Sequence, residues 1–284
     1  MSLLSHSELC VVIYPEQLVL LNAVNKLTPR GLKRHVHAQA NIPCEAGDDG
    51  DSLWSGAIRM LEKVLPLFAK RNMKVTVILS NHFVHYALIP WCDSLRGEKE
   101  EMAHARHCFE TLYGGAVDGW ELRLSPDKAG VPALASAVDK KLLEELRGVL
   151  GHAGVDIRSI QPHLMVAHNI CHASLRGCSA WLALLEPGNL CLAMLQKGQL
   201  AWMRKMRIGK TWQEELPTIL EREECLAGAE PAMNEVLLWA PHLHEKSESG
   251  DNIIPASLRW KFQHLKASQK HGFGLDHDGM AARA

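Results

Sequence analysis

The sequence predicts an α/β protein made of two lobes. Two observations predict this class: short leucine-rich and β-branched runs alternate with amphipathic helical segments, and the same order of elements occurs twice along the chain. The length of 284 residues fits two lobes of about 150 residues each. With 47% hydrophobic and 22% charged residues, the chain can bury a sizeable core, and its composition is not that of a disordered protein.

The first half opens with a predicted β-meander. Residues 8–14 (ELCVVIY) and 18–24 (LVLLNAV) form a hairpin around a turn at Pro15-Glu16, and a third strand covers 34–42. A helix follows an acidic loop, because apolar residues then recur at three- and four-residue spacing and make one apolar face. The residues of that face are Trp54, Ala57, Leu61, Val64 and Phe68.

Strands and helices alternate after this meander. The predicted strands are short apolar or β-branched runs, and they cover residues 73–80, 83–89, 121–124, 131–138 and 155–160. The predicted helices have striped apolar residues, and they cover residues 98–113, the segment between Asp139 and Gly151, and residues 162–174. An acidic first turn, an aspartate cap and a proline mark the three helix starts in that order.

The second half repeats this order. Strands are predicted over residues 180–186, 190–196, 199–208 and 235–240, with tight turns at Pro187-Gly188-Asn189 and Lys197-Gly198. Helices are predicted over 211–225 and near 256–266.

A β-meander followed by alternating helices and strands, present twice, is the order of a duplicated ribonuclease-H-like domain. We therefore expect a first lobe over residues 1–176 with an inserted subdomain at about 81–154. A second lobe over 177–266 and a loose C-terminal tail over 267–284 complete the expected organisation.

Three segments carry a resemblance to a known family. Residues 75–90 (VTVILSNHFVHYALIP) contain a buried strand, a small polar turn and a second strand that ends in proline before an acidic helix. Residues 131–162 contain a helix that ends in Ala-Gly-Val and then a strand ending in proline, and residues 204–212 (RKMRIGKTW) place Arg and Gly before a helix. In order and spacing these segments resemble the actin-like proteins of type IV pilus and type II secretion platforms, the PilM/GspL group. The resemblance covers residues 9–265 and implies the actin-like fold.

The resemblance implies a nucleotide site whose positions largely depart from the family's pattern. Active members cradle phosphates with an Asp-Gly hairpin turn in each lobe, because only glycine lets the backbone approach a phosphate so closely. Here the first turn is Tyr14-Pro15-Glu16, whose proline has no N–H to donate, and the second is Glu186-Pro187-Gly188. Trp239-Ala240-Pro241 replaces the Gly-Gly on the adenosine side, and only Gly209 keeps the family's glycine before the second lobe's helix. We therefore expect the ATP site to be lost and no cofactor to be bound.

With the nucleotide site lost, the resemblance implies an adaptor and not an enzyme. Family members without a transmembrane segment lie on the cytoplasmic side of the inner membrane and grip a short cytosolic peptide of a bitopic membrane protein. GspL-like proteins carry their own anchor after the cytoplasmic lobes, whereas this sequence stops at Ala284 without one. We expect a cytoplasmic, catalytically inert adaptor at the inner face of the inner membrane. The alternatives are an ATP- and magnesium-binding switch of the same machinery and a metal-dependent enzyme.

The expected docking surface is a strand edge. The strand over 83–89 lies near a sheet edge in this interpretation, and such an edge accepts main-chain pairing from an extended peptide. We expect the peptide between residues 81–154 and the first lobe. The candidate partner-binding residues are Phe83, His85, Ala87, Ile89 and Trp91, the last as an exposed anchor after a strand-ending proline.

Composition and motifs exclude several other classes. The 31 Lys+Arg and 32 Asp+Glu residues give a formal charge of −1, which argues against a nucleic-acid binder that neutralises phosphates. Eight cysteines without a C-x-x-C pair fit reduced thiols in the cytosol. There is no signal peptide and no apolar run of the ~18–20 residues that span a bilayer. Nucleophile-elbow, P-loop, dinucleotide-binding and zinc-protease motifs are absent.

Two sets of histidine and cysteine fall on single predicted helices at a spacing that could hold a transition metal. Core packing of the cysteine with histidines at the rim is the preferred interpretation of both sets, so no metal is expected. The sets are His104, His107 and Cys108, and His168, Cys171 and His172.

Adjacent charged residues have a similarly plain interpretation. Glutamate pairs at 100–101, 144–145 and 223–224 point about 100° apart on their helices, so we expect solvated helix faces and no acid/base pair. A basic cluster at 204–210, echoed at 259–266, could gain about 1 kcal/mol per residue at an anionic membrane surface. A solvated face is the preferred interpretation, and peripheral membrane association stays open.

Overall fold

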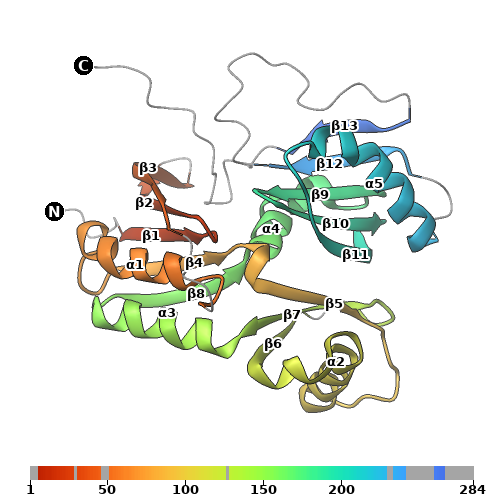
Figure 1. Cartoon of the computed structure of the whole chain (residues 1–284), viewed down its shortest axis with the longest axis horizontal. Coiled ribbons are helices and arrows are strands. Elements are labelled where there is room, and N and C mark those ends of the chain that lie inside the picture. The colour runs from red at the N-terminus through yellow and green to blue at the C-terminus, as the bar shows by residue number, and fades with distance from the viewer. Residues whose placement is uncertain are drawn as a thin grey trace. The chain divides into compact units, whose positions relative to one another are not determined.

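A computed structural model of the chain describes residues 6–28, 31–45, 51–125, 128–228, 233–240 and 259–265 (Figure 1). The chain divides into two compact units. One comprises residues 1–89, 94–125 and 135–166, and the other comprises residues 90–93, 126–134 and 167–284. The predicted lobe boundary after residue 176 stays a prediction, and the predicted tail lies outside the described residues.

The first unit contains a five-stranded sheet in the order β3-β2-β1-β4-β8. β2 pairs antiparallel with β1 and β3, which confirms the predicted meander, and β4 pairs parallel with β1 and β8. Every residue of β4 after Lys74 is buried, as expected for a strand covered on both faces. The strands are β1 His6–Ile13, β2 Gln17–Thr28, β3 Gly31–Pro43, β4 Lys74–Leu79 and β8 Asp156–Pro162.

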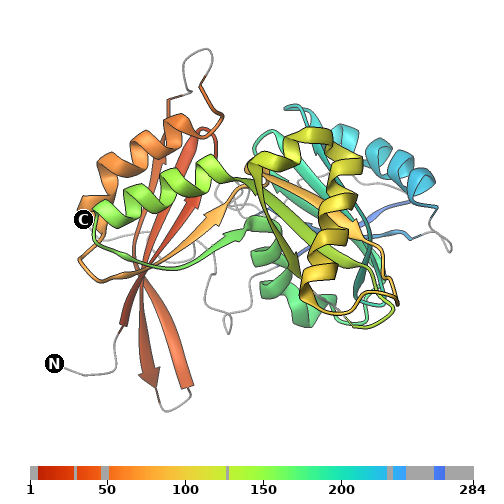
Figure 2. The same ribbon diagram turned by 90° about the horizontal axis from the view of Figure 1, so that it is seen from below.

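Two helices of this unit lie side by side against the sheet (Figures 1 and 2). They are α1 (Ser55–Phe68) and α3 (Lys140–His152). The predicted stripe of α1 is confirmed only in part: Ala57 and Leu61 are buried, together with Ile58 and Leu65, whereas Trp54, Val64 and Phe68 are partly exposed. Asp139 caps α3 as predicted, because its carboxylate accepts a hydrogen bond from the Lys141 N–H at 2.8 Å. The helix α4 (His163–Leu175) follows β8 directly.

A small module is inserted between β4 and α3. Its sheet has the order β5-β7-β6, with β5 Val84–Ile89, β7 Ala133–Asp139 and β6 Trp120–Ser125. The helix α2 (Glu98–Tyr113) buries Ala105 and Phe109 in the module's core, whereas Leu112 on the same helix is 63% exposed. Short 3₁₀ turns at Asn81–Phe83 (η1) and Gly114–Gly119 (η2) precede β5 and β6.

The second unit repeats the topology of the first sheet. Its strands have the order β11-β10-β9-β12-β13, again with an antiparallel meander and two parallel pairings. The helix α5 (Trp212–Ala227) packs Leu216 and Leu220 into the core of this sheet. The strands are β9 Ala180–Glu186, β10 Asn189–Gln196, β11 Gln199–Arg207, β12 Glu235–Trp239 and β13 Lys261–His264.

The helix predicted near residues 256–266 is wrong where the structure describes it. Residues 261–264 form β13 and pair in parallel with β12. The ladder is extended by Lys261 N–H donating to Asn234 and by Leu265 N–H donating to Leu238, both at 2.8 Å. Trp260 and Leu265 are buried at the two ends of the strand. Pairing with the exposed edge of β12 therefore overrides the local helical pattern.

The turn between β10 and β11 lies tightly against the chain that follows α4. Gly198 has φ +83°, and its N–H donates to the Cys178 carbonyl. A Cβ atom at this position would lie 2.6 Å from the Gly177 nitrogen and 2.9 Å from the Leu175 oxygen. Glycine is therefore required here both for its backbone conformation and for space.

Three sheet edges carry an irregularity in their pairing. One residue lacks a partner in each register: His37 in β3, Arg158 in β8 and Ala201 in β11. Such bulges bend and twist an edge strand locally.

Candidate functional site

The first candidate phosphate turn is a closed hairpin corner. Tyr14 N–H donates to the Gln17 carbonyl at 2.9 Å, and the Glu16 carbonyl accepts from Cys44 N–H at 2.8 Å. Pro15 supplies no donor. The Tyr14 side chain is buried and meets the ring of His163 edge-on, with 6.2 Å between the centroids. Hydrogen bonds within the hairpin and to Cys44 thus occupy these backbone groups of the turn, whereas the Glu16 side chain is exposed.

Buried polar residues occupy the carboxyl ends of β1, β4 and β8, where α/β sheets commonly bind ligands. Ser80, Asn81 and His163 are completely buried there. The Asn81 Oδ1 atom accepts from the Tyr86 hydroxyl at 2.6 Å and from the Leu164 N–H at 3.3 Å. These hydrogen bonds connect the end of β4 to β5 and to the start of α4, and the Ser80 hydroxyl accepts from the His82 N–H at 3.2 Å. Sequence reasoning noted only a small polar turn here and missed His163. Polar residues directly after buried strands were the available clue.

The second candidate phosphate turn contains a buried carboxylate. Glu186 and Asn189 flank Pro187-Gly188, and both are buried; the Asn189 amide donates to Glu186 Oε2 at 3.5 Å. Burial lowers the pKa of Lys205, although the negative charge of Glu186 acts in the opposite direction. Burial and the Glu186 carboxylate raise the pKa of Cys191 to about 12. A buried negative charge at this turn opposes a phosphate unless a cation accompanies it.

Gly209 precedes α5 without the close contact that a phosphate-binding glycine needs. A Cβ atom added there would lie 3.8 Å from Thr211 Oγ1, an ordinary contact. Glu214 and Glu215 occupy the first turn of α5, and Thr211 donates to Glu215 at 2.6 Å. A helix N-terminus favours anions. In α5 the carboxylates of Glu214 and Glu215 already provide negative charge at this position.

The predicted adenosine-side position is filled by apolar side chains. Trp239 and Ala240 are 3% and 2% exposed at the carboxyl end of β12. Ala240 belongs to the core beneath α5. Pro241 lies outside the described residues.

The predicted docking strand is an edge strand, as β5 ends its described sheet. Most of the candidate side chains on this strand pack inside the small module. Phe83 is buried, Ala87 and Ile89 belong to the core beneath α2, and the ring of His85 stacks on Trp120 at 3.9 Å. Recognition at this strand would therefore use the backbone.

Trp91 is exposed as predicted but is assigned to the other compact unit. It is 44% exposed, and its indole N–H donates to Asp93 at 2.6 Å. The structure does not bring Trp91 and the strand residues together in one unit.

The two histidine–cysteine sets do not gather further ligands. Among the described residues, no group of three histidine, cysteine or acidic side chains could hold a metal ion. Cys108 lies 3.9 Å from His104 Nε2, and burial raises the pKa of the Cys108 thiol. Cys171 is buried with a pKa raised to about 12, a protonated thiol unsuited to metal binding.

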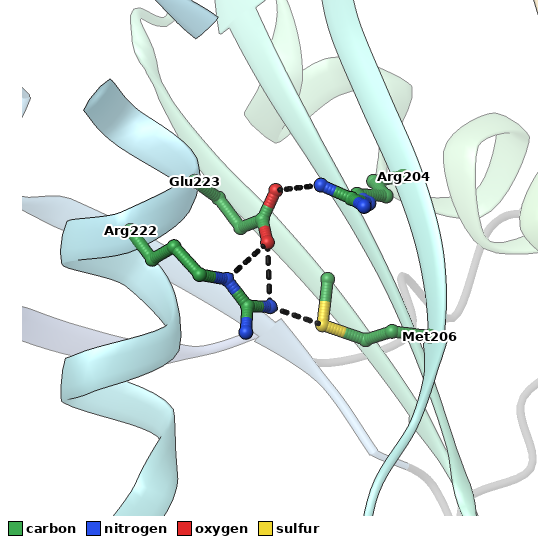
Figure 3. Close-up of polar contacts among 4 residues, drawn as sticks. All are labelled: Arg204, Met206, Arg222 and Glu223. Carbon is green, nitrogen blue, oxygen red and sulfur yellow. Dashed lines mark hydrogen bonds and ion pairs between the residues drawn. The ribbon is translucent and has the colours of Figure 1, made fainter. Parts of the chain in front are cut away.

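The expectation of a solvated face at residues 223–224 is wrong. Glu223 is fully buried and binds Arg204 at 3.2 Å and Arg222 at 2.6 Å; Arg222 also contacts the Met206 sulfur (Figure 3). Glu224 is buried as well, accepts from Met233 N–H at 3.2 Å, and pairs with Arg259. Adjacent residues of a helix point in different directions. The Glu223 carboxylate therefore reaches Arg204 on β11, and the Glu224 carboxylate reaches Arg259 just before β13. By contrast, Glu144 and Glu145 are exposed as expected.

The basic cluster at 204–210 is accordingly not a uniform solvated patch. Arg204 forms an ion pair with Glu223, and Lys205 is half-buried on the opposite face of β11. Only Arg207 and Lys210 are exposed without such a role in the contacts described above.

Comparison with known proteins identifies relatives by structure alone. No family model and no curated protein sequence matches the chain. It is similar to the cytoplasmic domain of EpsL, an inner-membrane component of the type II secretion system of Vibrio cholerae, with TM-score 0.57, 11% identity and coverage of 95% of this chain and 97% of that one. It is also similar to a chain of the PilM-PilN type IV pilus biogenesis complex, with TM-score 0.61, 14% identity and coverage of 84% and 83%. A Bacteroides thetaiotaomicron protein with an actin-like ATPase fold and unknown function gives TM-score 0.52, 10% identity and coverage of 82% and 81%.

These likenesses show the fold. The predicted α/β, actin-like architecture with a duplicated meander and α/β units is confirmed, as is the resemblance to the PilM/GspL group at the level of structure. No helix in the described part of the chain is long and apolar enough to span a membrane.

Proposed function

We propose that the protein is a non-catalytic actin-like adaptor of type IV pilus or type II secretion assembly. It binds the cytosolic segment of a bitopic inner-membrane protein and works at the cytoplasmic face of that membrane. The proposal is supported by the fold shared with the EpsL cytoplasmic domain and with a chain of the PilM-PilN complex.

The observation that carries the non-catalytic part is the pair of altered phosphate turns. Pro15 and Pro187 each remove a backbone donor where two hairpin turns would cradle phosphate. The carboxylates of Glu186, Glu214 and Glu215 add negative charge at the second turn and at the start of α5. Neither feature favours a nucleotide.

The edge position of β5 supports docking by strand addition. Main-chain hydrogen bonds would provide the affinity of an extended peptide, because the side chains of Ala87 and Ile89 are already used in the module's core.

Isothermal titration of ATP with magnesium tests the inert adaptor against the ATP-dependent switch. We expect no heat and no thermal stabilisation under conditions that detect a Kd of about 100 μM, or about −5.5 kcal/mol. Saturable one-to-one binding would overturn the inert adaptor in favour of the switch, and Gly188→Pro should then abolish it.

Synthetic peptides test the partner. The probes are the cytosolic segments of bitopic pilus and type II secretion proteins encoded in the same genome, titrated by fluorescence anisotropy. A peptide N-methylated at alternate residues cannot pair with β5 in one register, whereas the same peptide methylated at the intervening residues can. We expect only one methylation pattern to abolish binding. Equal binding of both would refute strand addition, and the failure of every peptide would refute the adaptor.

A further inference from the structure

The strand β6 ends the small three-stranded sheet on the side opposite β5. Within the described part of the chain its only strand neighbour is β7, so the outer N–H and C=O groups of β6 have no strand partner there. Proline and inward-pointing charges are common protections of such an edge. The sequence of β6, WELRLS, contains no proline, and its two charged residues have opposite sign. The edge of β6 is therefore a surface on which another strand can pair.

One face of β6 carries an apolar row, because side chains of a strand alternate between the two faces of its sheet. Trp120 and Leu122 are buried in the module's core, where α2 covers the sheet (Figure 2). Leu124 packs against the same core but stays partly exposed at the end of the row. An apolar side chain placed beside Leu124 from outside would complete its burial.

The opposite face of β6 carries one acidic and one basic residue, two positions apart. The Glu121 Oε1 atom binds Arg123 at 2.8 Å, and the Glu121 Oε2 atom binds Arg147 of α3 at 3.3 Å. The Arg123 side chain is 77% exposed, so its ion pair within the strand is solvated and weak. Arg123 can therefore exchange this contact for another carboxylate at little cost.

The order of these residues is self-complementary in an antiparallel strand pair. When two copies of β6 pair around Leu122, Glu121 of each copy lies opposite Arg123 of the other. Trp120 of each copy then lies opposite Leu124 of the other. A pair centred on Glu121 or on Arg123 would instead place like charges opposite each other, which destabilises a strand pair. A shift by one residue would place the apolar row beside the charged row.

Pairing between copies also brings the opposite charges closer than β6 itself does. Positions two residues apart along a strand are separated by about 6.5 Å, whereas directly opposed residues have Cβ atoms about 4.5–5.5 Å apart. In this arrangement Glu121 keeps Arg147 on one oxygen and accepts the partner's Arg123 on the other. Each charged group of the row thus retains an opposite charge.

We propose that two copies of the chain associate through β6, in antiparallel register around Leu122. The contact joins the two small sheets into one continuous sheet with the α2 helices of both copies on the same face. Because the same patch is used by both copies, the contact closes on itself and gives a dimer, not a filament. The matched order of Glu121 and Arg123 favours a second copy over an unrelated peptide at this edge. The edge strand β5 takes no part in the contact.

Sedimentation velocity of the full-length protein, from low to high micromolar concentration, tests this inference. We expect a dimer that is weak, because a single strand pair buries little area, and that weakens further as salt rises. The variants Glu121→Arg and Arg123→Glu each create two like-charge oppositions and should raise the dimer Kd roughly thirtyfold. The matched controls Glu62→Arg and Lys63→Glu make the same charge changes at exposed positions of α1 and should dimerise like the wild type.

Mixing the two single β6 variants separates charge pairing from other effects. In the mixed pair each opposed position again joins an acid to a base, so we expect a heterodimer of about wild-type affinity. The double variant Glu121→Arg/Arg123→Glu should form a homodimer for the same reason. The charge beside Arg147 stays reversed in that variant, so its recovery would exclude loss of the contact with α3 as the cause of the effect.

Absence of a dimer at every concentration would overturn the proposal, as would a dimer that neither single variant weakens. Equal weakening by the α1 controls would leave only a net-charge effect and also overturn it, and so would failure of the mixed variants to associate. Near-UV circular dichroism confirms that each variant is folded. Peptide binding at β5 should persist in all variants, so failure of the dimer contact is distinguishable from failure of the adaptor.

Discussion

Replacement of Glu223 by glutamine tests the buried ionic cluster that fixes α5 to β11. Its carboxylate accepts hydrogen bonds from Arg204 at 3.2 Å and from the Arg222 Nε at 2.8 Å, and it is fully buried. Each charged hydrogen bond contributes about 1.5–3 kcal/mol, and removing one partner of a fully buried pair costs about 3–5 kcal/mol. The two arginine side chains are 52% and 58% exposed, so they regain water when the carboxylate is lost. We therefore expect Glu223→Gln to lower the free energy of unfolding of the second unit by about 2 kcal/mol.

Urea unfolding at pH 7, followed by tryptophan fluorescence and far-UV circular dichroism, measures this loss. Separate transitions of the two compact units are fitted individually. Glu221→Gln is the matched control, because Glu221 is exposed on the same helix, and we expect it to change stability by less than about 0.5 kcal/mol. If Glu223→Gln unfolds at the same urea concentration as Glu221→Gln, the cluster does not stabilise α5 and the reasoning is wrong.

Three further outcomes are expected. Gly198→Ala should destabilise the second unit by at least about 3 kcal/mol and Gly228→Ala by about 1 kcal/mol, because both have positive φ but only the first meets backbone atoms; thermal unfolding compares them. The free energy of unfolding should fall as pH rises above 9, because Cys171 and Cys191 have pKa values of about 12 in the folded protein whereas unfolded thiols ionise near 9.0. In urea titrations, a Cys171→Ala/Cys191→Ala variant should lose less unfolding free energy between pH 8 and 10 than the wild type. Arg259→Met should speed amide exchange in β13, and unchanged protection would contradict the role of its ion pair with α5.

Most of the fold was predictable because local patterns and tertiary pairing agree. Asp139 is a helix cap in the sequence and in the structure, and the predicted helix over 98–113 has the bounds of α2. The last strand was not predictable, since residues 261–264 become extended only by pairing with β12. No periodicity within the segment itself contains that information.

The candidate site was predictable in part. The changed phosphate turns could be found by position, because proline and glycine have the same backbone consequences in any context. The burial of Glu223 could not be found, because an acidic residue on a helix is usually solvated. Its burial is tolerable because Arg204, from a strand distant in sequence, and the neighbouring Arg222 both pair with it. Ser80, Asn81 and His163 also meet only through the parallel strands that carry them.

The irregular pairing at His37, Arg158 and Ala201 has a consequence for copies of the chain at high local concentration. An added strand needs an evenly spaced row of N–H and C=O groups, and a bulge interrupts that row. β3, β8 and β11 each contain one, and the remaining edge strand of the second unit, β13, has only four residues. Copies of the chain at high concentration are thereby hindered from growing into shared sheets at these four edges, which leaves the two described edges of the small three-stranded sheet, β5 and β6, open to an added strand.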